Sequence, residues 1–192
     1  TSIVKVNIDD GKDTHTGYAF NSTGRYACGA QMRNRFIPRL LSVNDDEILD
    51  NNGDIDTKKA LNIMMIGEKP GGDMERSVPI GTIETALWDA ISKSKKLPLY
   101  EYLSQKFPNY NSTNRMFCYV GGGYYDDGKT INDLKDEIRN NFDNGYRLMK
   151  IKIGGAPIKE DIKRVEAAIE TVGSPDKIAL DANGGLKEEH II

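Results

Sequence analysis

Lysine and acidic side chains occur within or at the end of two short apolar segments of this sequence. The first segment reads Lys-Ile-Lys-Ile and contains Lys150 and Lys152, and the second ends with Asp181 and Asn183. Strand side chains alternate between two faces, so the two lysines share one face, and so do Asp181 and Asn183. If both strands lie parallel in one barrel, two ammonium groups face a carboxylate near its C-terminal rim, where barrels keep their active sites. The spacing therefore predicts a base beside a metal ligand.

The two lysines have an alternative explanation as the charged, solvent-facing side of a half-buried strand. In a barrel, however, helices cover the outside and side chains fill the interior, so neither face of a strand meets bulk water. Burial lowers the pKa of a lysine, and a second ammonium group nearby lowers it further, which provides a neutral amine near neutral pH. Lys150 and Lys152 together therefore indicate base chemistry more strongly than either one alone.

Asp181 and Asn183 offer oxygen atoms where a hard cation such as Mg²⁺ could bind. Both residue types also commonly cap the start of a helix, and the sequence leaves this alternative open. One carboxylate does not complete a magnesium site, so further oxygen ligands must come from elsewhere.

Two loops could contribute to ligand binding. Residues 21–26 form a polar, glycine-containing stretch in which Asn21 and Arg25 could contact a small anion, although a solvated loop explains the same composition. Residues 67–73 contain Lys69 among glycine and proline, and no regular element can hold that segment.

The elements that position these residues change character along the chain. Alternation predicts a hairpin from strands 2–8 and 16–20, and helical spacing then predicts several helices, the longest of which starts near Ser77 and Pro79. From residue 115 onward strands alternate with amphipathic helices, which predicts a parallel sheet with right-handed crossovers, either doubly wound or a barrel. The strands are predicted over 116–120, 147–153 and 178–180, the helices over 130–142 and 157–172, and a further helical turn over 188–192.

Composition excludes several classes of protein. The chain has 192 residues, 38% hydrophobic and 29% charged, with a net charge of −3. There is no basic field for nucleic acid, no polybasic patch for a lipid surface and no apolar run long enough to cross a bilayer. Cys28 and Cys118 are far apart, which indicates buried thiols in a reducing compartment rather than a disulfide or zinc site. We expect a cytoplasmic protein.

Six sequence blocks, in order along the chain, carry a family resemblance. They are Gly-Tyr-Ala-Phe-Asn-Ser-Thr-Gly-Arg-Tyr (17–26), Glu-Lys-Pro-Gly-Gly (68–72), Glu-Arg-Ser-Val-Pro-Ile-Gly-Thr (75–82), Gly-Gly-Tyr-Tyr (122–125), Lys-Ile-Lys-Ile-Gly-Gly-Ala-Pro (150–157) and Leu-Asp-Ala-Asn-Gly (180–184). With these blocks the chain resembles the enolase superfamily, in its mandelate racemase branch, and within that branch the D-tartrate dehydratases. The resemblance covers essentially the whole chain.

The resemblance implies an α/β protein of two parts. Residues 1–114 would form an α+β capping domain without its first strand, and residues 115–192 the first three strands of a modified (β/α)8 barrel. The implied cofactor is one Mg²⁺ ion, and the implied substrate is a small hydroxy acid. D-tartrate would give oxaloacetate and water through an enediolate. Another acid-sugar dehydratase, a racemase or a non-catalytic subunit remain as alternatives.

The resemblance also implies individual roles. Lys152 would take the proton α to the carboxylate, with Lys150 as its electrostatic partner. Asp181 would be the first metal ligand, and Asn183 would lie beside it. The implied substrate-binding residues are Lys69, Asn21 and Arg25.

Three positions depart from the family pattern, and the barrel is short. Asp126 and Asp127 stand where tyrosine and proline are expected, and Gly185 stands where a basic residue usually follows Asn-Gly. Such a barrel needs roughly 250 residues, whereas 116–192 provide under three βα units. We therefore expect about half of a protein, a homo-oligomer when complete, whose remaining ligands and acid lie beyond residue 192. The isolated chain should neither fold stably nor turn over substrate.

Overall fold

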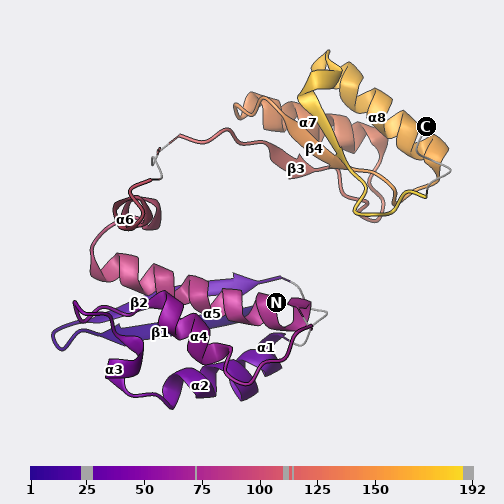
Figure 1. The fold of residues 1–192 in the computed structure, drawn as a ribbon. Coiled ribbons are helices and arrows are strands. Elements are labelled where there is room, and N and C mark those ends of the chain that lie inside the picture. Colours follow the sequence, from indigo (N-terminus) through magenta and orange to yellow (C-terminus); the bar gives the residue numbers. More distant parts are fainter. Residues whose placement is uncertain (23–27, 72, 110–112, 114, 188–192) are drawn as a thin grey trace. The chain divides into compact units, whose positions relative to one another are not determined.

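The computed structural model describes residues 1–22, 28–71, 73–109, 113 and 115–187 (Figure 1). Two compact units make up the chain, Thr1–Ser112 and Thr113–Ile192. Each unit has its own apolar core. They are described in turn.

The first unit is built on a hairpin that lies along one long helix (Figure 1). Strands β1 (Ser2–Asp9) and β2 (Thr14–Asn21) pair antiparallel, as the alternation predicted, and they pack on α5 (Asp73–Ser94). The contact is very close at Gly17, where a Cβ atom would lie 2.1 Å from the carbonyl oxygen of Ala86. Only glycine therefore allows this approach of strand and helix.

Short helices complete this unit, and their buried side chains form its core. Phe36 and Met64 are fully buried there and pack with Ile83 of α5. The helices are α1 (Cys28–Gln31), the π-helix η2 (Met32–Phe36), α2 (Ile37–Leu41), α3 (Asp45–Ile48), α4 (Thr57–Met64) and α6 (Leu99–Lys106).

Helix α5 begins earlier than the sequence signals predicted. Ser77 and Pro79 were expected to start it, but the helix begins at Asp73 and Pro79 lies buried inside it. Proline adopts a helical φ and so can lie inside a helix, although the helix loses one backbone hydrogen bond there. The carboxylates of Asp73 and Glu75 stabilise the first turn, because they lie near the positive end of the helix dipole.

The second unit is a three-stranded parallel sheet in the order β3-β4-β5. Its strands are β3 (Val120–Gly122), β4 (Met149–Lys152) and β5 (Ile178–Asp181). The strand expected over 116–120 was placed too early, because the backbone pairing with β4 begins at Val120 and includes the glycines. The other two strands lie within one or two residues of their expected bounds.

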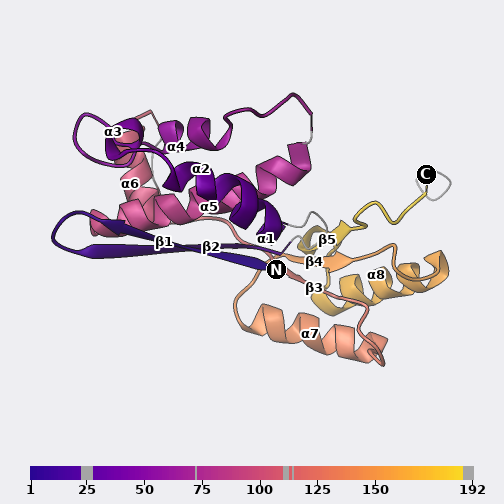
Figure 2. The ribbon, with the colours of Figure 1, turned by 90° about the horizontal axis from the view of Figure 1, so that it is seen from below.

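Helices α7 (Ile131–Asp143) and α8 (Ile158–Val172) cover one face of this sheet (Figure 2), and η3 (Pro175–Lys177) leads into β5. The core between helices and sheet contains Leu134, Ile138, Met149, Ile151 and Ala168. Met149 and Ile151 point to the helices, so Lys150 and Lys152 point to the opposite face. A capping box of Thr130 and Asp133 starts α7, and Gly173 in the left-handed conformation ends α8.

Candidate active site

Lys150, Lys152 and Asp181 meet on the face of the sheet that carries no helix. Lys152 lies directly opposite Asp181 in the parallel pairing of β4 and β5. Its Nζ atom donates to Oδ2 of Asp181 at 2.7 Å, and Nζ of Lys150 lies 3.0 Å from the same oxygen. The three side chains are 21–30% exposed. The two lysines and the carboxylate predicted to face one another are therefore in contact.

Asn183 joins this group because the chain turns directly after β5. Its backbone is left-handed, with φ of +45°, and its N–H donates to Oδ1 of Asp181 at 3.1 Å. Its side-chain Oδ1 accepts a hydrogen bond from Nζ of Lys152 at 2.9 Å. Residues 182–187 contain no helix, so Asp181 and Asn183 do not cap one within the described part of the chain.

The charges of this group stabilise one another. Hydrogen bonds from Lys152 and Lys150, together with the N–H of Asn183, hold the pKa of Asp181 well below its usual range. The hydrogen bond to Asp181 raises the pKa of Lys150, although partial burial opposes the rise. The prediction of a lowered pKa was therefore wrong for Lys150. The attraction of a carboxylate 3.0 Å away outweighs both burial and the second ammonium group.

Two tyrosines that the sequence argument did not assign to the site lie beside the ammonium groups. Nζ of Lys150 is 5.6 Å from the ring centre of Tyr119, and Nζ of Lys152 is 6.0 Å from that of Tyr124. Both distances allow cation–π attraction. The signal available in the sequence was the position of these aromatic residues just before and just after β3, the strand that pairs with the lysine strand.

Gly185, which departs from the family pattern, has a steric explanation. A Cβ atom at this position would lie 2.7 Å from the carbonyl oxygen of Gly154 and 3.0 Å from that of Ala182. The loops after β4 and β5 thus touch through their backbones. In this arrangement of the two loops, position 185 has no room for a side chain.

The other predicted binding residues belong to the first unit. Lys69 has an exposed side chain, and its carbonyl oxygen accepts a hydrogen bond from Arg76 at 2.5 Å. The side-chain amide of Asn21 donates to Oγ1 of Thr82 at 3.1 Å, and its Oδ1 is buried with no hydrogen-bond partner among the described residues. Arg25 lies outside the described residues.

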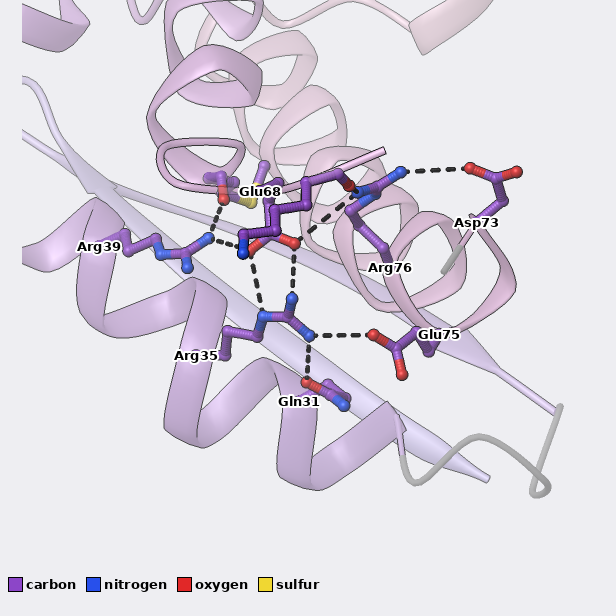
Figure 3. Close-up of polar contacts among 9 residues, drawn as sticks. Gln31, Arg35, Arg39, Glu68, Asp73, Glu75 and Arg76 are labelled. Atoms are coloured by element: carbon purple, nitrogen blue, oxygen red, sulfur yellow. Dashed lines mark hydrogen bonds and ion pairs between the residues drawn. The ribbon is translucent and has the colours of Figure 1, made fainter. Parts of the chain in front are cut away.

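The loop that carries Lys69 is held by a buried carboxylate that the sequence argument missed. The side chain of Glu68 is 3% exposed and contacts three arginines (Figure 3). Guanidinium nitrogens of Arg35, Arg39 and Arg76 lie 2.5, 2.7 and 3.8 Å from the carboxylate oxygens of Glu68. Burial opposes ionisation, but the hydrogen bonds from Arg39 and Arg35 prevail and lower the pKa of Glu68.

The described residues contain no group of three or more His, Cys, Asp or Glu side chains that could hold a metal ion. Asp181 therefore offers one carboxylate, with oxygen chemistry that suits a hard cation. Within the same described ranges, no helix is both long and apolar enough to span a membrane.

Known proteins resemble this chain in sequence. Residues 133–192 match the family described as enolase C-terminal domain-like. Arabinonate dehydratase of Saccharolobus solfataricus is 31% identical over 175 residues, which cover 89% of this chain and 43% of the relative. L-Ala-D/L-Glu epimerase of Bacillus subtilis is 29% identical over 118 residues, 57% of this chain and 27% of the relative.

Solved structures extend the likeness to nearly the whole chain. A member of the enolase superfamily from Polaromonas sp. JS666 matches with a TM-score of 0.73 and 25% identity, covering 98% of this chain and 46% of that one. A racemase from Streptomyces coelicolor with bound magnesium matches with a TM-score of 0.71 and 22% identity, covering 98% and 52%.

These matches define an α/β fragment of the enolase-superfamily fold that contains part of the barrel. The chain is therefore similar to members of the enolase superfamily, and the relatives quoted are a dehydratase, an epimerase and a racemase. The chain spans about half the length of the two solved structures quoted, 52% of one and 46% of the other.

Proposed function

We propose that this chain provides the base and one metal ligand of a magnesium-dependent hydroxy acid dehydratase. The observation that carries the proposal is Lys152 hydrogen-bonded to Asp181 and Asn183 on the helix-free face of the sheet. The proposed substrate is D-tartrate, which would lose water to give oxaloacetate. Arabinonate, named for the S. solfataricus relative, is the second candidate.

Lys152 is the proposed base. To accept the α-proton, its nitrogen must present a lone pair to the substrate carbon instead of N–H groups to Asp181 and Asn183. Lys150 stays charged, because Asp181 raises its pKa, and its positive charge would favour the negative charge that develops on the substrate carboxylate. The C–H bond breaks first and its proton goes to Lys152. The β-hydroxyl then takes a proton from an acid that a longer protein would supply and leaves as water, and the resulting enol becomes a keto acid.

Asp181 is the proposed metal ligand. Asn183 would keep it near Lys152, because its backbone N–H donates to Asp181 and its side-chain oxygen accepts from Lys152. A bound Mg²⁺ ion would supply further positive charge to the substrate carboxylate. The other ligands would come from further strands in a longer protein, because the described residues contain no group of three or more His, Cys, Asp or Glu side chains that could hold a metal ion.

The remaining assignments are part of the same proposal. Lys69 would bind a substrate carboxylate with its exposed ammonium group. Oδ1 of Asn21, which has no hydrogen-bond partner among the described residues, would accept a hydrogen bond from a substrate hydroxyl. Arg25 would add a second cation. We further propose that residues 1–114 act as a capping domain and that the full-length protein is a cytoplasmic homo-oligomer.

The test is incubation of the full-length protein and Mg²⁺ with D-tartrate, arabinonate, galactonate and mandelate. We expect a keto acid from D-tartrate. Inversion at the α-carbon without keto acid would instead establish a racemase, and a keto acid from arabinonate alone would transfer the assignment to that sugar acid. If no acid reacts, the dehydratase proposal is wrong and a non-catalytic subunit takes its place.

A further inference from the structure

A buried charged pair on α8 has no role in the chemistry described above. Asp161 is 3% exposed and Arg164 is 8% exposed, one turn apart on the helix. Burying two charges is costly, and well-packed apolar residues are often as stable in such places or more so. The contacts of the pair therefore call for an explanation beyond stability.

Asp161 joins the loops that follow β3 and β4. One of its carboxylate oxygens accepts a hydrogen bond from the hydroxyl of Tyr125, and the other accepts the N–H of Gly154 at 2.6 Å. Its place in the first turn of α8 also suits a carboxylate, since the helix N-terminus is positive.

Arg164 reaches the loop after β3 from the same helix. Its Nη2 atom donates to the carbonyl oxygen of Gly123 at 2.6 Å, and its guanidinium carbon lies 4.3 Å from the ring centre of Tyr125. Its Nε atom is 3.8 Å from Oδ1 of Asp161. Tyr125 is thus held by a hydrogen bond at its hydroxyl and by stacking at its ring.

Tyr125 is 38% exposed, but one part of its ring lies very close to the loop after β4. A Cβ atom at Gly155 would lie 2.6 Å from the tyrosine ring. The groups held in this way adjoin the candidate active site, because Tyr124 precedes Tyr125 and Lys152 stands two residues before Gly154. A displacement of either loop would move the ring of Tyr124 or the end of the lysine strand.

We propose that Asp161, Arg164 and Tyr125 form a loop clamp that positions Lys152 and Tyr124. They are positioning residues: they act through the two loops and do not themselves contact the reacting atoms. The functional part of this inference rests on the proposed function, whereas the structural part does not.

Two variants of the full-length protein test the clamp. Tyr125→Phe removes one hydrogen bond and keeps the ring, and Asp161→Asn removes the charge and leaves Arg164 uncompensated. Because a small misplacement of a base slows the chemical step, each should lower kcat about tenfold while KM changes less than about twofold. Glu170→Gln is the matched control, because Glu170 is 72% exposed on the same helix and pairs only with Lys135 among the described residues.

Amide hydrogen exchange provides a readout that does not need activity. In Asp161→Asn the amides of residues 153–156 should exchange faster than in the wild type, and in Tyr125→Phe those of residues 123–127 should do so. Glu170→Gln should leave both segments and kcat unchanged.

Unchanged exchange in both segments would overturn the clamp, and so would wild-type kcat in Tyr125→Phe and Asp161→Asn. A lower kcat in Glu170→Gln would also contradict it, because the effect would then belong to the helix as a whole. If the wild type turns over none of the acids, the proposed function fails, and the exchange rates alone decide whether the clamp exists.

Discussion

The Nζ atom of Lys152 lies 2.7 Å from Oδ2 of Asp181, and the two residues are direct partners in the parallel pairing of β4 and β5. The proposed base and the proposed metal ligand are therefore neighbours by strand register. Lys150 shares the same carboxylate oxygen. This arrangement predicts how stability depends on pH, and packing in the first unit predicts the effects of substitutions at Glu68 and Gly17.

The Asp181 interaction predicts a pH-dependent contribution to stability. The folded-state pKa of Asp181 is lowered, so its contribution is present above the unfolded pKa of about 4 and disappears as the pH falls through the folded value. The thermal midpoint of the full-length wild type should exceed that of Asp181→Asn at neutral pH, and the difference should shrink below about pH 4. A difference that stays constant from pH 7 to pH 2 would contradict the ion pairs.

Lys150 makes the opposite prediction at high pH. Its folded-state pKa is raised, so its contribution to stability is complete below the unfolded value of about 10 and is lost as the pH rises through the folded value. The advantage of the wild type over Lys150→Met should therefore decline only in strongly alkaline solution. A decline between pH 6 and pH 8 would show that Lys150 is not held by Asp181.

Glu68 should matter more for stability than an exposed carboxylate that contacts the same arginine. Glu68→Gln leaves Arg35, Arg39 and Arg76 without their shared charge, so we expect a loss of about 2 kcal/mol in the free energy of unfolding. Asp73→Asn is the control, because Asp73 is 83% exposed and its pair with Arg76 should contribute less than about 0.5 kcal/mol. Urea titration of the full-length variants measures both, and equal losses would contradict the account.

Gly17 is predicted to be intolerant of any side chain. Gly17→Ala would bring a Cβ atom within 2.1 Å of the backbone of α5, and separating the hairpin from the helix should cost about 3 kcal/mol. Gly81→Ala in α5 is the control, because no atom lies within 4 Å of its added Cβ and alanine favours a helix by about 1 kcal/mol. Thermal unfolding should shift in opposite directions for the two variants, and a stabilising Gly17→Ala would show that the contact is looser.

Local periodicity explains which parts of the fold could be predicted from the sequence. The hairpin and helices α7 and α8 follow from apolar spacing and caps, which act within a few residues. The start of α5 was misplaced because serine and proline resemble a helix start, whereas the helix already begins at Asp73.

Contacts between distant segments explain what could not be predicted. Face alternation placed Lys150 and Lys152 together, but the register that puts Asp181 opposite Lys152 is set by tertiary pairing, which also reversed the expected pKa shift of Lys150. Arg35 and Arg39 are 33 and 29 residues from Glu68, and Tyr125 is 36 residues from Asp161, so no local pattern signals these contacts.

The central claim is that Lys152 removes the α-proton. The direct measurement is the exchange of the α-hydrogen of D-tartrate and arabinonate in D2O, followed by NMR with the full-length protein and Mg²⁺. Lys152→Ala should lower the exchange rate by about a thousandfold, whereas Lys163→Ala, which changes an exposed lysine of α8, should leave it unchanged. Exchange at the wild-type rate in Lys152→Ala would contradict the claim.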